Sequence, residues 1–222
     1  MKEKFISPIT SNFSTPCITK RHLPHWLKEG SIYWVTFRLK GSIPASKSNI
    51  FKNDFETWRK NNPQPWNAEQ QRNYNRNWGQ RLEAWLDAGT GECFLRDAKV
   101  RDSVKRRILF FDGSRYDVLS FVIMPNHVHL LIHPKDGFSL SEIMNGIKGV
   151  SARESNKNLE RTGQPFWQDE SYDHIVRSTE QFLHYICYIA DNPQKAKLKD
   201  NEFTIYFSEK IKEVLLHVAP VS

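Results

Sequence analysis

The chain has 222 residues, a formal net charge of +7 at pH 7 and 39% hydrophobic residues. That length can bury the core of one large domain, and that hydrophobic content excludes a disordered polymer. The positive charge favours a polyanionic partner, of which nucleic acid is the commonest, although many basic proteins bind none.

The cysteines and the apolar runs indicate the cellular compartment. Three cysteines are scattered without a CxxC pair, a pattern that predicts a reducing environment and no disulfide framework. The first 16 residues lack the apolar core of a signal peptide. The longest apolar runs are too short to span a bilayer. We therefore expect a cytoplasmic protein.

The N-terminal half contains one strand and a long insertion. Residues 1–20 lack periodicity and are expected to form a loose arm. The run IYWVTFRL at 32–39 is rich in aromatic and β-branched residues, which predicts a strand. Residues 42–95 differ in character and contain two expected helices, at 50–60 and 68–88, around the loop NNPQPWN. This segment is interpreted as a helical insertion into a smaller fold.

The central part predicts a helix, a hairpin and a second helix. Apolar residues at helical spacing predict a helix over 97–111. Strands are expected at 116–124 and 126–133, separated by a short turn, so they should pair as neighbours. Ser139 and Glu142 form a capping-box pattern at the start of the next helix.

The C-terminal part predicts one more strand and one more helix. A short strand is expected at 171–177, and Ser178 is expected to cap a helix that Pro193 limits. The buried stripe of this helix should contain four residues: Phe182, Tyr185, Ile186 and Ile189.

Without the insertion, the element order is β, α, β, β, α, β and a further helix. This is the order of the ferredoxin-like α+β fold, with an antiparallel sheet, helices on one face and an extra C-terminal helix. We expect a single domain at 21–200 and a C-terminal extension at 201–222.

The stretch MPNHVHLL, residues 124–131, contains two histidines two positions apart. In a strand, residues i and i+2 share a face with α-carbons about 6.6–7 Å apart. His127 and His129 could therefore converge on one divalent cation, whereas Val128 points into the core. Two imidazoles alone rarely complete a metal site, so a third ligand is required. The alternative is a pair of partly buried histidines satisfied by hydrogen bonds.

A second stretch, YIADNPQKAKL at 188–198, could complete the site. Tyr188 and Asn192 are four residues apart and project from nearly the same face of a helix. If this face meets the histidine strand, Tyr188 becomes a nucleophile and Asn192 a third, oxygen ligand. The alternative is an aromatic residue on a helix flank followed by an ordinary helix stop.

Such a site suits attack on a phosphodiester. A phenol with a pKa near 10 is about 0.1% ionised at neutral pH, so it needs an activated electrophile. A divalent cation that grips a phosphate oxygen supplies that activation. Histidine and amide ligands suit Mg²⁺ or Mn²⁺, with Mn²⁺ the better match for imidazole. The products would be a covalent phosphotyrosine and a free 3′-hydroxyl.

Several stretches together resemble one family. These are RHLPHW, YWVTFRL, RLEAWLDAGTGECFLRD, VIMPNHVHLLIHP, FWQDESYDHIVRS and YIADNPQKAKL, which span roughly residues 20–200. In this order they resemble the REP-associated tyrosine transposases, relatives of the small insertion-sequence transposases with a His-hydrophobe-His (HUH) motif.

The resemblance implies a single-stranded DNA endonuclease and strand transferase of ferredoxin-like fold. Members of the family recognise repetitive extragenic palindromes, which fold as hairpins. The motif histidines match His127 and His129, the tyrosine that opens YIxxNP matches Tyr188, and Asn192 matches the third ligand. The chain has QKAKL in place of the more usual VKAGL.

Phosphate contacts are expected from four cations: Lys148, Arg153, Lys157 and Arg177. A solvated helix face is the alternative for each of them. In the insertion, Arg72, Arg76 and Trp78 could embrace a hairpin stem.

Two other functions compete with the nicking and rejoining enzyme. One is a catalytically silent regulator, derived from a transposase, that binds DNA hairpins. The other is a small-molecule phosphotransferase of the HxHxH type, which is disfavoured because Leu131 stands at the third position. Both a monomer and a homodimer are compatible with the sequence.

Overall fold

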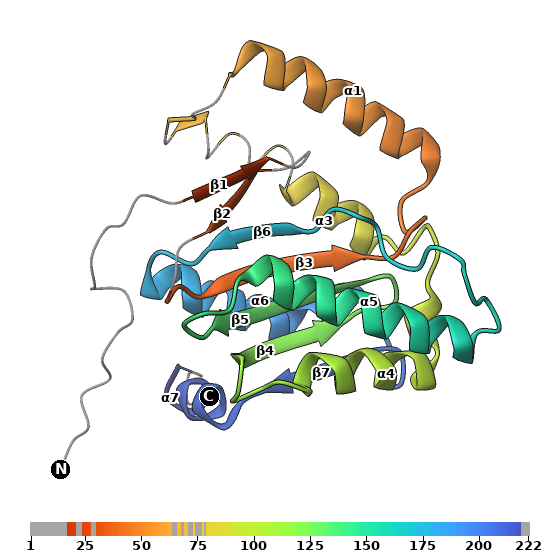
Figure 1. The fold of residues 1–222 in the computed structure, drawn as a ribbon, viewed down its shortest axis with the longest axis vertical. Coiled ribbons are helices and arrows are strands. Elements are labelled where there is room, and N and C mark those ends of the chain that lie inside the picture. The colour runs from red at the N-terminus through yellow and green to blue at the C-terminus, as the bar shows by residue number, and fades with distance from the viewer. Residues whose placement is uncertain are drawn as a thin grey trace.

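A five-stranded antiparallel sheet forms the centre of the protein (Figure 1). The computed structural model describes residues 17–20, 24–27, 30–63, 66–67, 69–70, 73, 77 and 79–218. The strands of the sheet stand in the order β6-β3-β5-β4-β7. Their bounds are Tyr33–Arg38 (β3), Tyr116–Ile123 (β4), His127–Pro134 (β5), Tyr172–Ile175 (β6) and Thr204–Phe207 (β7).

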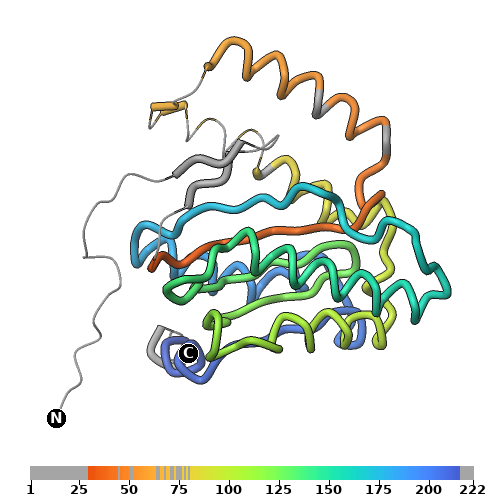
Figure 2. Tube along the Cα trace, viewed as in Figure 1, coloured from red at the N-terminus to blue at the C-terminus, as the bar shows by residue number. Residues whose placement is uncertain are grey.

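Two helices complete the predicted ferredoxin-like order. Helix α4 (Ala98–Leu109) connects β3 with β4, and α5 (Leu140–Asn158) connects β5 with β6. The expected βαββαβ fold is therefore confirmed, with the chain's fourth, first, third and second core strands side by side in the sheet. The fifth strand, β7, comes from the C-terminal extension and pairs with β4 (Figure 2).

The two faces of the sheet are covered by different helices. Val35, Phe37 and Leu130 belong to a buried apolar cluster that packs against α4 and α5. Trp34 and Leu131 alternate with them and belong to a second cluster, with residues of α6 (Thr179–Lys195) and α7 (Glu209–Val218). Figure 1 shows α5 and α6 on opposite sides of the sheet. The extra helix that carries Tyr188 therefore covers the face opposite to α4 and α5.

Local hydrogen bonds explain where the helices begin. The Asp97 side chain accepts from the backbone N–H groups of Lys99 and Val100, which caps α4. Ser139 and Glu142 form the predicted capping box of α5. Ser178 caps α6 by accepting from the N–H of Gln181, whose side chain in turn accepts from Arg177. Pro193, expected to limit this helix, lies inside α6, which ends at Lys195.

The insertion lies over the β6 edge of the sheet. Helix α1 (Ala45–Asn61) covers the first expected helix, and α3 (Gln80–Asp87) covers the end of the second. An aromatic cluster of Phe55, Trp58 and Trp66 reaches Tyr172 of β6. The predicted stem contacts of the insertion (Arg72, Arg76 and Trp78) lie outside the described residues.

The end of the insertion returns to its start. A Cβ at Gly91 would stand 2.3–2.4 Å from backbone atoms of Gly41 and Ser42, so only glycine permits this approach. Beside it, the N–H of Glu92 donates to the carbonyl of Gly41 at 3.0 Å. The two ends of the insertion are therefore held together.

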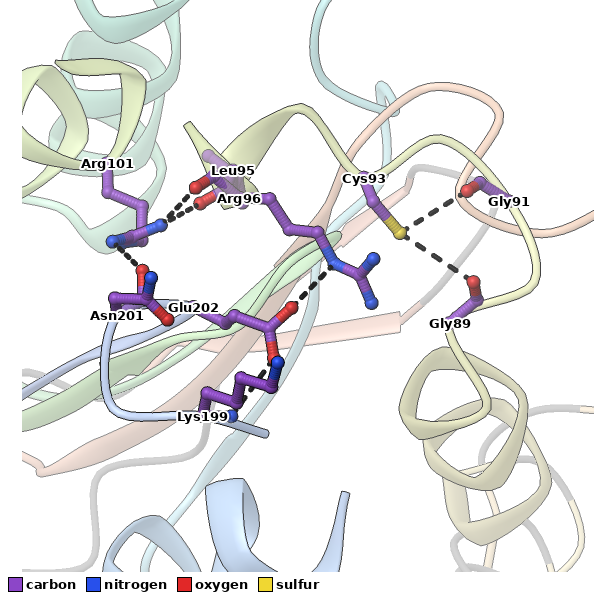
Figure 3. Close-up of polar contacts among 9 residues, drawn as sticks. All are labelled: Gly89, Gly91, Cys93, Leu95, Arg96, Arg101, Lys199, Asn201 and Glu202. Carbon is purple, nitrogen blue, oxygen red and sulfur yellow. Dashed lines mark hydrogen bonds and ion pairs between the residues drawn. The ribbon is translucent and has the colours of Figure 1, made fainter. Parts of the chain in front are cut away.

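Arg101 ties the insertion to the C-terminal segment (Figure 3). Its guanidinium donates to the carbonyls of Leu95 and Arg96 in the short 3₁₀ helix η2 (Phe94–Arg96), at 3.0 and 2.6 Å. It also donates to the carbonyl of Asn201 at 2.5 Å. An ion pair of 3.6 Å between Arg96 and Glu202 lies beside it. These bonds fix the chain after α6 to the segment that follows α3.

The N-terminal part contains a small hairpin. Strands β1 (Cys17–Lys20) and β2 (Pro24–Leu27) form a separate two-stranded sheet. Residues 17–20 fall within the range 1–20 expected to be a loose arm, and they form a strand instead because they pair with β2. Residues 1–16 lie outside the described residues.

Candidate active site

The two histidines of β5 share one face, as the parity of a strand predicts. His127 and His129 are fully buried, and their Nε2 atoms stand 2.9 Å apart. The ring of His129 stacks on Trp34 at a centroid distance of 5.0 Å. Val128 points the other way, into the cluster beneath α4 and α5. The histidines therefore lie on the face that α6 covers.

Asn126 determines which nitrogen of His127 carries a proton. Its side-chain N–H₂ donates to the carbonyl of Leu86 at 2.9 Å, which identifies the other end of the amide as the oxygen. That oxygen lies 2.6 Å from His127 Nδ1 and can only accept, so Nδ1 must donate. Burial lowers the pKa of His127 to about 3, so the ring is neutral. The Nε2 of His127 therefore carries a lone pair.

Thr36 allows His129 to exist as either tautomer. Its hydroxyl lies 2.9 Å from His129 Nδ1 and can donate or accept. Burial lowers the pKa of His129 well below its usual value, and the neighbouring His127 lowers it further. Without an ion, Nε2–H of His129 donates to the lone pair of His127. With Nδ1–H directed at Thr36 instead, both Nε2 atoms present lone pairs to a cation.

Tyr188 lies against this pair on α6. Its ring is perpendicular to that of His129, with centroids 5.1 Å apart. Its hydroxyl is buried near Glu83 and Asn192, which both influence its pKa, but it forms no hydrogen bond of ordinary geometry within the described residues. Burial raises the pKa of the phenol, and Glu83 and Asp87 raise it further. Tyr188 is therefore protonated at neutral pH.

Two carboxylates of α3 approach the same place. Glu83 and Asp87 are four residues apart on this helix of the insertion. Burial raises the pKa of Glu83 to about 7, with a further contribution from Asp87. Burial also raises the pKa of Asp87 to about 6, against the effect of Lys195. The Oδ1 of Asp87 lies 3.8 Å from His127 Nε2.

The donor atoms fit a divalent cation. Two ligands at right angles on a cation about 2.1 Å away stand about 3 Å apart, which matches the 2.9 Å between the histidine Nε2 atoms. The Oδ1 of Asn192 is buried without a hydrogen-bond partner in the described part of the chain. Counting only His, Cys, Asp and Glu, the described residues contain no group of three that could hold a metal ion. A site here therefore depends on the Asn192 oxygen, or on a side chain that moves toward the ion.

The predicted phosphate contacts are divided between the two layers. Lys148, Arg153 and Lys157 belong to α5, on the opposite face of the sheet from Tyr188. The ammonium of Lys148 donates to the carbonyls of Gln168 and Asp169, each at 2.8 Å, and to Ser171 at 3.2 Å. Only Arg177 lies next to α6. All four contacts stay predictions.

Sequence patterns missed five residues of this site. Asn126 and Thr36 orient the histidines, Glu83 and Asp87 approach from the insertion, and Lys195 lies 5.8 Å from the centre of the Tyr188 ring. Asn126 could have been suspected from its place beside His127. The carboxylates carry no signal of their own, because an acidic pair at i, i+4 is common on solvated helices.

Comparisons with known proteins point to one family. Residues 98–192 match the family model described as IS200-like transposase, which covers less than half of the chain but includes both histidines, Tyr188 and Asn192. The predicted resemblance to a transposase family is thus confirmed, and the match supports a DNA transposase. No curated protein sequence matches the chain.

The solved structures that are similar to this chain include two transposases. One is a REP-associated tyrosine transposase bound to a REP hairpin, with 13% identity, 80% of this chain and 74% of that chain covered, and a TM-score of 0.38. The other is a candidate transposase of Deinococcus radiodurans, with 13% identity, coverage of 78% and 96%, and a TM-score of 0.32. Similarity at TM-scores this low does not establish a shared activity.

Within the described residues, no helix has the length and apolar character needed to cross a membrane.

Proposed function

Residues 98–192, which include both histidines, Tyr188 and Asn192, match the IS200-like transposase family model, and on this premise we propose a specific activity. The protein is a metal-dependent endonuclease and strand transferase for single-stranded, hairpin-forming DNA of the REP palindrome type. The observation that carries the proposal is the contact of Tyr188 on α6 with the histidine pair on β5. The ring centroids of Tyr188 and His129 lie 5.1 Å apart. We expect it to act in the cytoplasm.

Tyr188 performs the cleavage step. Its phenol oxygen attacks the phosphorus of a phosphodiester and forms a P–O bond. The bond from phosphorus to the 3′ oxygen breaks, and that oxygen keeps the electron pair and takes up a proton. The products are a 5′-phosphotyrosine and a free 3′-hydroxyl. Attack by a 3′-hydroxyl on the phosphotyrosine reverses the step and rejoins a strand, so bond energy is conserved.

The phenol needs a group that takes its proton, because burial raises its pKa. Glu83 is the carboxylate beside it, and its own pKa of about 7 suits proton exchange near neutral pH. Glu83 therefore serves as the proton acceptor of the nicking step and returns the proton when the strand is rejoined.

His127, His129 and Asn192 would hold the divalent cation, Mg²⁺ or Mn²⁺. When bound, the cation neutralises charge on the phosphate and polarises it toward attack. The role of the chain is to present two lone pairs and one amide oxygen from a strand and a helix that are already packed together. Asn126 holds His127 in the tautomer that such binding requires.

The DNA partner is supported by charge and by the family resemblance. A net charge of +7 suits a polyanion. Lys195 lies beside Tyr188 and is suited to neutralise the phosphate next to the attacked one. Arg177, at the start of α6, is expected to bind the same strand.

The test is formation of a covalent adduct. The full chain is incubated with a hairpin oligonucleotide that carries a single-stranded extension, with Mn²⁺, and run on a denaturing gel. We expect a shifted protein band that disappears in Tyr188→Phe and persists in Tyr185→Phe. Tyr185 is the control because its hydroxyl already contacts His174 and Gln181. An adduct in Tyr188→Phe would reject the assigned nucleophile. Hairpin binding without an adduct at any Mn²⁺ concentration would support the silent regulator instead.

A further inference from the structure

Asp87 brings a buried carboxylate oxygen from the insertion to the histidine pair. Its Oδ1 lies 3.8 Å from His127 Nε2 and has no hydrogen-bond partner among the described residues. The position is fixed by the residue before it, because the carbonyl of Leu86 accepts from Asn126 at 2.9 Å. The same asparagine also orients His127. One amide therefore aligns the end of α3 with the imidazole that it faces.

The carboxylate oxygen of Asp87 finds no donor on the imidazole that it faces. Nδ1–H of His127 is directed at Asn126, and its Nε2 lone pair accepts from His129 when no ion is bound, so His127 has no proton to donate to Asp87. A buried acceptor without a donor is unfavourable. The amide oxygen of Asn192 is a second buried acceptor without a hydrogen-bond partner within the described residues. A divalent cation satisfies both oxygens, and the two imidazole lone pairs as well once His129 directs its proton at Thr36.

We infer that Asp87 is a ligand of the catalytic cation, supplied by the insertion in addition to His127, His129 and Asn192. This inference rests on the proposed function, because it concerns the ion of that site. Ligands at right angles stand about 3 Å apart, so the Asp87 oxygen must approach His127 by under about 1 Å. The side chain is 31% exposed, which leaves room for this rotation.

Ion binding then couples the insertion to the catalytic sheet. Asp87 ends α3, so a bond from its carboxylate to the ion ties that helix to β5 and α6. Glu83 lies one turn earlier on the same helix, beside Tyr188. Closure of Asp87 on the ion therefore also holds the proton acceptor against the nucleophile.

The experiment measures Mn²⁺ binding by the full chain, without DNA. Isothermal titration calorimetry compares the wild type with Asp87→Asn, which keeps the shape and removes the charge. We expect at least a tenfold weaker Kd for Asp87→Asn. Asp54→Asn is the matched control, because it also removes one carboxylate from the insertion. The carboxylate of Asp54 pairs with Arg81 of α3 at 2.9 Å. We expect it to bind Mn²⁺ as the wild type does.

A second measurement uses hydrogen exchange in place of affinity. Hydrogen exchange of the α3 amides, residues 80–87, is followed in the wild type with and without Mn²⁺. We expect exchange to slow at least severalfold with the ion, and to lose this response in Asp87→Asn. A wild type that binds Mn²⁺ without slowing α3, or an Asp87→Asn protein of unchanged affinity, would overturn the inference and leave the proposed function intact. A wild type that binds no Mn²⁺ would overturn both.

Discussion

The two faces of the central sheet contrast although they share the same strands. On the face toward α4 and α5, β5 places Val128, Leu130 and Ile132 in a continuous apolar cluster. On the face toward α6, it places His127 and His129. There the neighbouring Tyr188 and Asn192 have buried polar atoms without hydrogen-bond partners in the described part of the chain. Such atoms reduce stability. The apolar face therefore provides stability that offsets the cost of a polar, preorganised site on the other face.

The largest expected effect results from changing Glu83 on the polar face. Glu83→Gln cannot accept the phenol proton, so the rate of adduct formation should fall about 10²- to 10⁴-fold. Its stability at pH 7 should not fall, because a buried carboxylate is removed. The rate is measured with a single-turnover adduct assay, and the stability with a urea melt. An unchanged rate would show that the proton goes elsewhere.

The next effect separates the two faces directly. Leu130→Ala on the apolar face should lower the free energy of unfolding by about 2–5 kcal/mol, because it opens a cavity in the buried cluster. The folded fraction should still bind Mn²⁺. His129→Leu on the polar face should cost less stability, about 1–3 kcal/mol, because it leaves Thr36 and His127 without a partner, and it should abolish Mn²⁺ binding. Urea melts and calorimetry measure the two quantities. Loss of Mn²⁺ affinity in folded Leu130→Ala would contradict this separation.

A smaller effect is the pH dependence of stability without metal. His127, with a pKa of about 3, and His174, of about 4, are neutral when folded, as is His129. The unfolded chain binds more protons below pH 6.5, so their stabilising contribution is complete above that pH and is lost on acidification. Glu83 and Asp87 have raised pKa values of about 7 and 6, so their contribution has the opposite sign and is lost as the pH rises.

Between pH 6 and 4.5, unfolding takes up about three protons at the three histidines and releases about two from the two carboxylates. The unfolded chain therefore binds about one more proton than the folded chain. Between pH 6 and 4.5 these groups should lower the free energy of unfolding by about 1.4 kcal/mol per pH unit. Glu83→Gln removes one of the two opposing carboxylates, so the free energy of unfolding of this variant should fall by about 2.8 kcal/mol per pH unit. Urea melts in EDTA at several pH values between 6 and 4.5 measure both slopes. Equal slopes for the two proteins would exclude the raised pKa of Glu83.

The smallest effect tests whether the apolar side takes part in DNA binding. Arg153→Ala, on the exposed side of α5, should weaken hairpin binding a few-fold and reduce the salt slope by about 1 if it contacts a phosphate. Lys195→Ala, beside Tyr188, should weaken binding at least as much. Fluorescence anisotropy at several salt concentrations measures both. An unchanged salt slope in Arg153→Ala would confine DNA to the polar face.

Local features of the protein could be predicted from the sequence alone. Alternation along β5 assigned Val128 to the core and the histidines to the other face, because the side-chain period of a strand is two. The capping box at Ser139 and the order of the elements predicted the ferredoxin-like sheet, and helical spacing placed Tyr188 with Asn192. Each of these depends on neighbours within one element or on the order of elements along the chain.

Long-range packing determines which faces meet. A helix with an apolar stripe could cover either side of a sheet, and only the folded chain shows that α6 covers the histidines. The bond from Asn126 to Leu86 joins residues 40 positions apart, and it brings the acidic side of α3 to the two histidines. No local pattern distinguishes Glu83 and Asp87 from solvated acids, because burial and partners, which raise their pKa values, exist only in the folded protein.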